Sequence, residues 1–371
     1  MKRLLLIDGH AILHRAFHAL PPLTTSNGTP VNAVYGFVRM LLKVIDDLKP
    51  THLAVCFDRP EPTFREKIFA GYQAQRPKME EELVSQVDLV KKVVRTMKIP
   101  IYEKAGYEAD DIIGSLAVQA AEVAHENLRD PLLARDKTQV VHHLIGAVSE
   151  AISANFVGSP PPACPPVFET IIVTGDKDIL QLVNEKTKVY MLIKGLSMAK
   201  LFGAKEVKEK YGIEPKQMVD YKALVGDPSD NYPGVKGVGP RTAAELLKCF
   251  GTLERIYDKI NSFQSLFRKD EKTHVHQFVN ERVFKALKQD KERADLAKKL
   301  AKIVTDAPVK LDLEKARLGK LDKPEVRKLF SRLEFKSLIP RLENKADGKE
   351  VTLRTQNKIE NAERNKQLSL I

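Results

Sequence analysis

Short apolar segments alternate with longer amphipathic segments along the first half of the chain. Residues 4–7, 53–57 and 170–174 are apolar runs bounded by polar residues or glycine, which is typical of buried parallel strands. Between them, residues 31–48 and 83–97 have the spacing of amphipathic helices. Strands that alternate with helices predict an α/β fold, in which helices cover both faces of one parallel sheet.

One segment interrupts this alternation. Residues 127–168 follow a helix that begins near Asp110, and they combine a helical apolar stripe between 140 and 152 with five prolines between 158 and 166. We interpret the segment as an inserted helix on an extended Pro-rich linker. It either binds a partner or is a surface insertion without one.

The second half of the chain has a different character. Beyond about residue 200, helical segments rich in Lys and Arg replace the strand pattern, and past Asn344 the apolar stripe ends. The expected domains are therefore an α/β core at 1–199, a helical unit at 200–343 and a flexible polar tail at 344–371.

Charge separates the two halves as well. The 371 residues include 61 Lys and Arg against 49 Asp and Glu, which gives a net charge of +12. Residues 1–199 hold 23 of each kind, so the 38 basic and 26 acidic side chains of residues 200–371 carry the whole excess. A neutral half joined to a basic half indicates a chemistry module attached to a module that binds a polyanion such as nucleic acid. A solvated lysine-rich surface would give the same count.

Composition narrows the class of protein further. A chain with 43% hydrophobic and 30% charged residues is ordinary for a globular protein, which excludes a largely disordered one. No apolar run near the N-terminus is long enough for a signal peptide or a membrane span. Cys56, Cys164 and Cys249 lie far apart and match no zinc or redox spacing, which suits the reducing cytoplasm.

Carboxylates mark the ends of the predicted strands. Asp8 and Asp58 follow the first two strands directly, and Asp176 and Asp178 follow the third. In an open parallel sheet the carboxyl ends of the strands share one edge, so these side chains are expected in one crevice. Two more acidic clusters, one opening a helix and one in a turn bounded by glycine and proline, complete a set of Asp8, Asp58, Glu108, Asp110, Asp111, Asp176, Asp178, Asp227 and Asp230.

So many carboxylates in one cleft repel one another unless cations neutralise them. Oxygen ligands without nearby His or Cys favour Mg²⁺, with Mn²⁺ as a substitute, over zinc. Two such ions about 4 Å apart can activate a water and stabilise the leaving oxygen of a phosphodiester. Each aspartate taken alone is better explained as a helix cap or a turn residue, but the common position of the set at strand ends favours a metal centre.

Histidines at four-residue intervals form a second candidate site. His10, His14 and His18 would share one helix face, as zinc ligands do, but no further His or Cys completes a ligand set. We therefore interpret them as a helix surface beside the acidic crevice.

A glycine-rich loop in the basic half is the candidate for phosphate binding. In residues 234–243, glycines such as Gly237 and Gly239 let backbone amides approach an anion, and the following helix directs its N-terminus to the same place. Lys236 and Arg241 add positive charge. Such a loop would contact the backbone of DNA rather than its bases, and its plain alternative is a tight turn between helices.

Together these motifs resemble the bacterial 5′–3′ exonuclease, the flap-endonuclease-like domain found at the N-terminus of DNA polymerase I and sometimes as a free protein. The resemblance rests on Asp8-Gly9, Phe57-Asp58 and residues 108–111, 175–178 and 226–243. Apart from the insertion, it runs from residue 1 to about 343. It implies a PIN-like, Rossmann-type nuclease core with a helical arch at about 60–82. An all-α helix–three-turn–helix domain, of the helix-hairpin-helix type, would follow and hold duplex DNA, often with a K⁺ ion.

The resemblance also implies roles by position. It implies a first metal cluster of Asp8, Asp58, Glu108, Asp110, Asp111 and Asp176, and a second of Asp178, Asp227 and Asp230 that Asp176 can bridge. DNA would be contacted by Arg15, by the arch residues Phe64, Arg65, Tyr72 and Arg76, and in the glycine-rich loop by Lys236, Gly237, Gly239, Arg241 and Thr242. The catalytic residues would be Asp8, Asp58, Asp110, Asp176 and Arg76.

Two positions depart from the family pattern. The arch has Gln73 where relatives usually carry a lysine that neutralises the scissile phosphate, and His14 stands where relatives usually have tyrosine. Losing one catalytic cation would lower the rate by roughly 10²–10³. Arg76, or else Lys78, is the candidate to supply the charge instead.

The last five residues resemble the short peptide by which bacterial replication proteins bind the sliding clamp. The candidate contacts are Gln367, Leu368, Leu370 and Ile371. Because no polymerase domain follows, we expect a free-standing nuclease, and the hypothesis is that this tether raises its local concentration at nicks. A polar tail without such a role is the alternative.

The resulting prediction is a monomeric, Mg²⁺-dependent 5′ nuclease of the bacterial cytoplasm and nucleoid. It would remove flaps and RNA primers and act at nicks or gaps in replication and repair. Two alternatives stay open. One is a branched-DNA-binding protein whose catalysis is weakened by Gln73, and the other is a PIN-type ribonuclease, although such ribonucleases lack the loop at 234–243.

Overall fold

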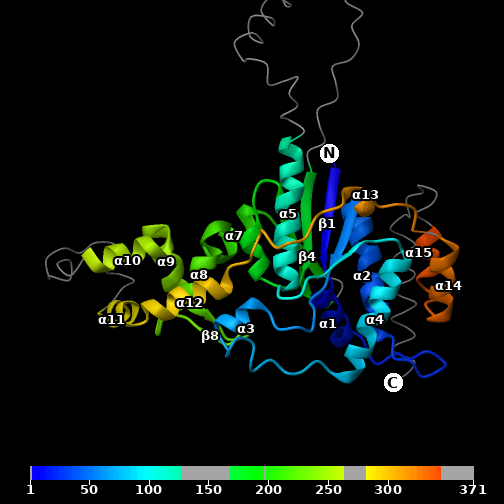
Figure 1. Ribbon diagram of the computed structural model, residues 1–371, viewed down its shortest axis with the longest axis horizontal. Helices are drawn as coiled ribbons and strands as arrows, with labels where there is room; N and C mark the ends of the chain where they lie inside the picture. Colours follow the sequence, from blue (N-terminus) through cyan, green and yellow to red (C-terminus); the bar gives the residue numbers. More distant parts are fainter. Residues whose placement is uncertain (1, 127–167, 196–197, 263–280, 322, 344–371) are drawn as a thin grey trace, which may run out of the picture.

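The structure is a computed structural model that describes residues 2–126, 168–195, 198–262, 281–321 and 323–343 (Figure 1). Except for Phe168, the expected insertion at 127–168 lies outside the described residues, as does the tail at 344–371 with its candidate clamp-binding peptide. Among the described helices, none combines the length and the apolar character that crossing a membrane requires.

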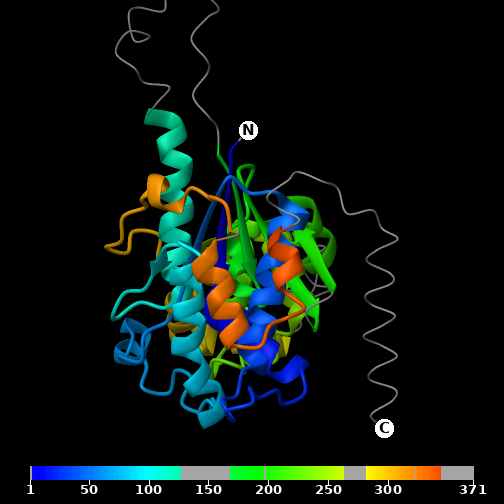
Figure 2. The same cartoon turned by 90° about the vertical axis from the view of Figure 1, so that its right-hand side faces the viewer.

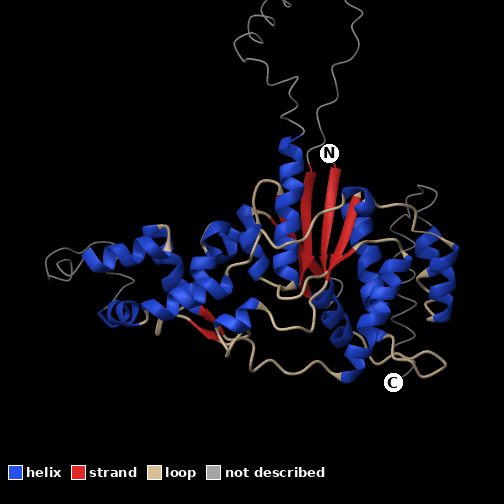
Figure 3. Cartoon of the chain, viewed as in Figure 1, coloured by secondary structure: helices blue, strands red, loops and turns tan. Residues whose placement is uncertain are grey.

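Within the described residues, six strands form one sheet with the order β3-β2-β1-β4-β5-β6 (Figure 3). Neighbouring strands are parallel except for the antiparallel pair β5 and β6. The strands are β1 (Lys2–Asp8), β2 (His52–Cys56), β3 (Ile101–Tyr102), β4 (Phe168–Thr174), β5 (Thr187–Lys194) and β6 (Met198–Phe202). The three strands predicted from apolar runs are confirmed as β1, β2 and β4, the adjacent and largely buried strands of the centre.

The other three strands were not predicted. β3 has only two residues. β5 contains a continuous apolar run at residues 189–193, flanked by Lys188 and Lys194, so the apolar pattern allowed a strand here that was not predicted. β6 is an edge strand whose side chains are mostly exposed, so burial does not shape its composition.

The pleat of β1 divides the core into two layers, because successive side chains point to opposite faces. Leu5 and Ile7 share an apolar core with α1, α2 and α4, whereas Leu4 and Leu6 share one with α5. Figure 2 shows α5 and α2 on opposite sides of the sheet. The helices are α1 (Gly9–Ala19), α2 (Asn32–Leu48), α4 (Glu81–Thr96) and α5 (Ala109–Glu126). The predicted two-sided α/β core is confirmed.

A helical unit follows β6 and lies at one end of the sheet (Figure 1). Its elements are α7 (Ala204–Tyr211), η2 (Pro215–Gln217), α8 (Met218–Val225), α9 (Pro240–Phe250), α10 (Leu253–Ser262), α11 (Glu281–Gln289) and α12 (Lys291–Ala301). α8 packs against α9 and α12. Two short strands, β7 (Gly226–Asp227) and β8 (Tyr232–Pro233), pair between α8 and α9.

The last described helices return to the core. They are α13 (Leu313–Ala316), α14 (Pro324–Arg332) and α15 (Ile339–Glu343). Val326 and Phe330 of α14 join the apolar layer of α2 and α4, and Figure 2 shows α14 in orange beside them. The predicted helical unit at 200–343 thus ends in helices that pack on the α/β core.

The expected helical arch at 60–82 is mostly irregular. Its one helix is α3 (Phe64–Ile68), and residues 69–80 form turns and extended backbone before α4 begins. Pro77 disfavours a helix here, and Gln73 adopts a left-handed conformation with φ of 52°.

Candidate active site

One threonine ties the carboxyl ends of β1 and β4 together. Asp8, the last residue of β1, caps α1 by accepting the backbone N–H of Ala11 at 3.0 Å. Its other carboxylate oxygen accepts the Thr174 hydroxyl at 2.7 Å, and the Thr174 oxygen in turn accepts the backbone N–H of Asp176 at 3.0 Å. Asp8 and Asp176 therefore lie side by side, as their strand-end positions predicted. Thr174 itself was not identified from the sequence.

Asp58 joins this group from the end of β2. It accepts the backbone N–H of Ala109, the first residue of α5, at 2.6 Å, and its other oxygen lies 3.1 Å from Nδ1 of His10. The start of α5 thereby brings Asp110 into the same crevice, where the charges of Asp176 and Asp58 both act on its carboxyl. His10 lies beside the acidic crevice, as the histidine spacing suggested.

Burial gives several of these carboxyls unusual proton affinity. Burial, together with the charge of Asp58, raises the pKa of Asp8 to about 6. Burial also raises the pKa of Glu108 to about 7, and that of Asp110 well above its ordinary range. For Asp58 burial acts in the same direction, but the contacts with His10 and Ala109 and the charge of Arg76 together outweigh it and lower the pKa. These groups need cations around them to be ionised together at neutral pH.

A second acidic cluster surrounds a lysine. Asp178, Asp227 and Asp230 have carboxylate oxygens within 4.8 Å of one another. The ammonium of Lys222 on α8 lies 2.5 Å from Asp178 and also contacts Asp227. Burial and the nearby charge of Asp176 raise the pKa of Asp178 to about 7. Lys222 was not identified from the sequence, although it stands one helical turn before the Gly-Asp turn.

Asp176 lies between the two clusters. Its charge adds to burial in raising the pKa of Asp8 and of Asp110 in the first cluster. It does the same for Asp178 and Asp230 in the second. The structure thus brings the predicted acidic residues of both clusters, apart from Asp111, close enough to act on one another electrostatically.

Asp111 and Arg65 differ from this pattern, because they are buried against each other. The guanidinium makes two hydrogen bonds to the Asp111 carboxylate, at 2.7 and 2.8 Å, and its other N–H groups donate to the carbonyl oxygens of Leu300 and Lys302. The two side chains are 2% and 0% exposed. This geometry supports a structural role rather than the DNA contact and metal ligation that the sequence led us to expect of Arg65 and Asp111.

The arch reaches the crevice through Tyr72, Gln73 and Arg76. The buried Tyr72 hydroxyl donates to Glu108 at 3.3 Å. The Gln73 amide donates to the Asp230 carboxylate at 3.0 Å and accepts from Arg76 at 3.1 Å. The charge of Arg76 acts on carboxyls of both clusters, since it opposes the burial-driven rise in the pKa of Asp230 and contributes to the low pKa of Asp58.

Two further predicted DNA contacts lie at the rim. Arg15 passes over the backbone beyond β4 so closely that a Cβ on Gly175 would lie 2.9 Å from its Nη2 atom. Phe64 is half-buried, and the Arg65 guanidinium carbon lies 4.6 Å from its ring centre. Arg15 therefore places a positive charge beside the strand ends, whereas Phe64 covers the buried arginine.

The glycine-rich loop at 234–243 leads into α9 as predicted. The predicted DNA contacts of this loop are all exposed or half-buried: Lys236, Gly237, Gly239, Arg241 and Thr242. Gly237 has φ of 80°, and nothing lies within 4 Å of where its Cβ would be. The backbone N–H of Lys236 already donates to the Asp290 carboxylate at 2.8 Å. Val235 and Val238 also donate their backbone N–H groups within the protein, to the carbonyl oxygens of Leu224 and Val235. The open space around Gly237 and Gly239, at the N-terminus of α9, suits a phosphate.

The donors of the crevice fit hard divalent cations. They are carboxylate oxygens, partly or wholly buried except for those of the exposed Asp176, and those of the second cluster are close enough to share one ion. Burial and closely spaced charges raise the pKa values of Asp8, Glu108 and Asp178, and a metal ion bound beside them would lower these values.

Comparisons with known proteins identify the family of the chain. The family description "5′-3′ exonuclease, N-terminal resolvase-like domain" matches residues 3–153, and "5′-3′ exonuclease, C-terminal SAM fold" matches residues 213–324. The 5′-3′ exonuclease of Aquifex aeolicus is 34% identical over 339 residues, which cover 91% of this chain and 94% of that protein. This chain belongs to the 5′–3′ exonuclease family.

Other members of the family are parts of longer proteins. DNA polymerase I of Bacillus caldotenax is 35% identical over 352 residues, which cover 95% of this chain but 34% of the polymerase. The chain thus spans about a third of the length of the polymerases that it matches.

Solved structures confirm the predicted flap-endonuclease-like fold. The T5 D15 protein co-crystallised with metal ions aligns over 90% of this chain and 100% of its own length, with a TM-score of 0.56 and 15% identity. The catalytic core of Rad2 in complex with DNA substrate aligns over 92% of both chains, with a TM-score of 0.51 and 16% identity.

Proposed function

We propose that this chain is a structure-selective 5′–3′ exonuclease and flap endonuclease that hydrolyses phosphodiesters of DNA and of RNA primers. The position of Asp176 carries the proposal, because one carboxylate lies between an acidic cluster at the strand ends and another at the β7–β8 turn. Two clusters that share a member supply oxygens for two ions beside one phosphodiester. Membership of the 5′–3′ exonuclease family supports the same reaction.

The proposed ions are Mg²⁺, with Mn²⁺ as a substitute. The first would be held by Asp8, Asp58, Glu108, Asp110 and Asp176, and the second by Asp178, Asp227 and Asp230. When bound, such ions polarise a water and the phosphodiester oxygens. Thr174 keeps Asp8 and Asp176 in register, and Lys222 balances the charge of the second cluster.

The arch supplies the protein's own positive charge. Gln73 is neutral, but its hydrogen bond holds Arg76 at the mouth of the crevice, where its charge acts on carboxyls of both clusters. We propose that Arg76 takes the place of the expected arch lysine and contacts the scissile phosphate, with Arg15 beside the strand ends.

The loop at 234–243 is proposed to hold duplex DNA through its backbone. Lys236 and Arg241 project positive charge from the loop, and open backbone at Gly237 and Gly239 allows close approach of a phosphate. A K⁺ ion in this loop is part of the same proposal. Duplex bound here would direct a 5′ flap toward the arch, which would select branched, nicked or gapped substrates.

The deciding experiment uses a 5′-labelled flap duplex with purified protein, with and without Mg²⁺. Asp176→Ala is compared with Asp306→Ala, which removes an exposed aspartate of a surface loop. We expect Mg²⁺-dependent cutting near the junction that is lost in Asp176→Ala and kept in the control. Tight binding without cleavage in Mg²⁺ or Mn²⁺ would instead support the branched-DNA-binding alternative. Preferential cutting of unbranched RNA would support a PIN-type ribonuclease.

Three further features stay predictions. They are a monomeric state, a location in the bacterial cytoplasm, and binding of the sliding clamp through residues 367–371. Deletion of residues 367–371 should abolish clamp binding and leave cleavage of a small flap substrate unchanged. Clamp binding that survives this deletion would remove the tail from the proposal.

A further inference from the structure

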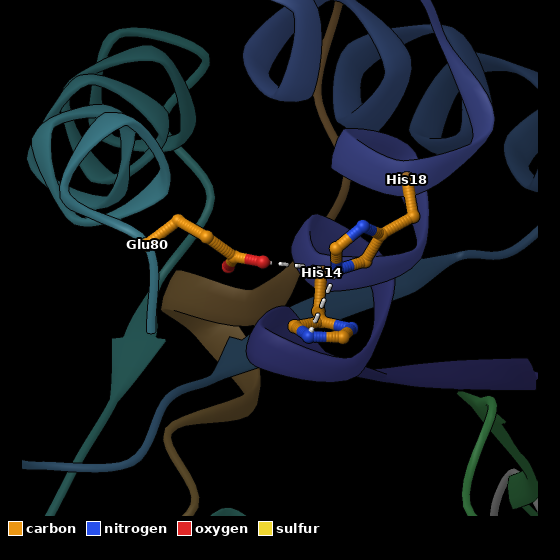
Figure 4. A group of neighbouring side chains, drawn as sticks. All are labelled: His14, His18 and Glu80. Atoms are coloured by element: carbon orange, nitrogen blue, oxygen red, sulfur yellow. Dashed lines mark hydrogen bonds and ion pairs between the residues drawn. The ribbon is translucent and has the colours of Figure 1, made fainter. Parts of the chain in front are cut away.

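Three metal-ligating side chains meet outside the acidic crevice. His14 and His18 lie one turn apart on α1, and Glu80 is the last residue of the arch before α4 (Figure 4). The two Nε2 atoms are 3.2 Å apart, and Nε2 of His18 lies 3.8 Å from a carboxylate oxygen of Glu80. All three side chains are exposed, so an ion can reach them from solvent.

Their geometry is close to that of one tetrahedral ion. With metal–nitrogen bonds of about 2.0–2.1 Å, two ligand atoms of a tetrahedral zinc site are about 3.3 Å apart. The two imidazole nitrogens already have this separation, and rotation of the exposed Glu80 side chain closes the remaining gap. Two histidines and one glutamate are also a donor set that zinc uses when it keeps one position open for water.

Nitrogen donors set this group apart from the acidic crevice. Imidazole favours Zn²⁺ and neighbouring first-row metals, whereas carboxylate oxygens alone favour Mg²⁺. His10 does not belong to the group, because its Nδ1 atom lies against Asp58. The histidine spacing was visible in the sequence, but the third ligand was not, since Glu80 is distant along the chain.

We propose that His14, His18 and Glu80 form a binding site for a transition-metal ion of the Zn²⁺ class, which ties the end of the arch to α1. The ligands come from two elements, so a bound ion restricts the segment between α3 and α4. The site is close enough to Arg76 for the two to interact electrostatically. A bound cation therefore adds positive charge beside the arch residue proposed to meet the phosphate.

The test is a titration of the whole protein with Co²⁺ in excess Mg²⁺, followed by displacement with Zn²⁺. Mg²⁺ fills sites made of oxygen ligands, and tetrahedral Co²⁺ with nitrogen ligands absorbs strongly in the visible range. Glu80→Gln and His18→Asn each remove one ligand. Glu81→Gln is the matched control, because it makes the same substitution at the neighbouring residue. Loss of a residue that only hydrogen-bonds to a metal ligand typically weakens metal binding by roughly 10–100-fold. We expect each ligand variant to weaken Co²⁺ binding by more than this. Glu81→Gln should bind as the parent does.

Proteolysis of the arch gives a second measurement. Zn²⁺ should slow cutting between α3 and α4 in the parent and in Glu81→Gln, and have no effect in Glu80→Gln. The Co²⁺ absorption should persist in Asp176→Asn, which separates this site from the acidic crevice. The proposal is overturned if Co²⁺ gives no nitrogen-ligand absorption, or if Glu80→Gln and Glu81→Gln bind equally well. The three side chains would then only hydrogen-bond to one another.

Discussion

The side-chain amide of Gln73 donates a hydrogen bond to the carboxylate of Asp230 at 3.0 Å, which ties the arch to the second acidic cluster. The backbone N–H of Gln73 donates to the carbonyl oxygen of the same aspartate at 2.9 Å. With both donors engaged, the side-chain oxygen of Gln73 is left to accept from Arg76 at 3.1 Å. A neutral residue therefore fixes the position of a cation, at the place where the resemblance led us to expect a lysine.

The first prediction concerns the positive charge of Arg76. Arg76→Gln should lower the single-turnover rate of flap cleavage by roughly 10²–10³, because it removes the cation beside the scissile phosphate. Gln73→Lys alone should change the rate little, since Arg76 already supplies the charge. In the double variant, the new lysine should recover much of the loss. A large gain from Gln73→Lys alone would show that the parent lacks a catalytic cation.

The second prediction concerns the buried pair of Arg65 and Asp111. Arg65→Met leaves the Asp111 carboxylate, which is 0% exposed, without its partner. Breaking a buried ion pair in this way costs about 3–5 kcal/mol in the free energy of unfolding, measured by denaturant titration. The control is Arg59→Met, which removes an arginine paired with Glu61 on the surface and should leave stability unchanged. Equal stability of the two variants would contradict a structural role for Arg65.

How much the sequence could predict depends on what each residue touches. The aspartates at strand ends were predictable, because parallel strands must deliver their carboxyl ends to one edge of the sheet. Thr174 was not, since a threonine that ends an apolar strand carries no sign of its bonds to Asp8 and Asp176. Lys222 resembled any helical surface lysine until the fold brought Asp178 to it.

For Arg65, the role expected from the resemblance does not fit the structure. An arginine in an expected arch is read as a surface cation, but only the tertiary fold brings Asp111 and two backbone carbonyls around it. A resemblance to a family assigns a role to a residue by its position in a motif. Whether its side chain is buried depends on elements that lie far apart in the sequence. The same holds for Glu80, which meets His18 only after the arch has folded back to α1.

The third prediction is a pH dependence of the metal-free protein. Burial raises the pKa of Asp178 to about 7, whereas in an unfolded chain an aspartate ionises near pH 3.9. Between about pH 4 and pH 7 the folded state therefore binds more protons at this group, and the stability that it contributes falls as the pH rises. Asp8 and Glu108 act in the same direction, with pKa values of about 6 and about 7.

Thermal unfolding across pH checks this sign. The Tm of the metal-free parent should fall between about pH 5 and pH 8 by more than that of Asp178→Asn, which has one titrating carboxyl fewer. Mg²⁺ should raise the Tm more at about pH 8 than at about pH 5, because protons compete with the ion for the same oxygens. A pH profile that is the same in parent and variant would contradict the raised pKa of Asp178.

The last prediction tests why the second cluster needs a glycine at its base. Gly226 has φ of 79°, and a Cβ there would lie 2.3 Å from the backbone nitrogen of Gly234, so β7 and β8 must separate in Gly226→Ala. Gly237 has nearly the same φ, 80°, but nothing lies within 4 Å of its Cβ position. Gly237→Ala should therefore lower the free energy of unfolding by only about 1–2 kcal/mol, the cost of a left-handed backbone conformation for a residue with a Cβ. Gly226→Ala should lose clearly more and also weaken Mg²⁺ binding measured by calorimetry, because Asp227 moves with β7. An equal loss of stability in the two variants, with Mg²⁺ binding intact, would show that the strand pair does not position Asp227.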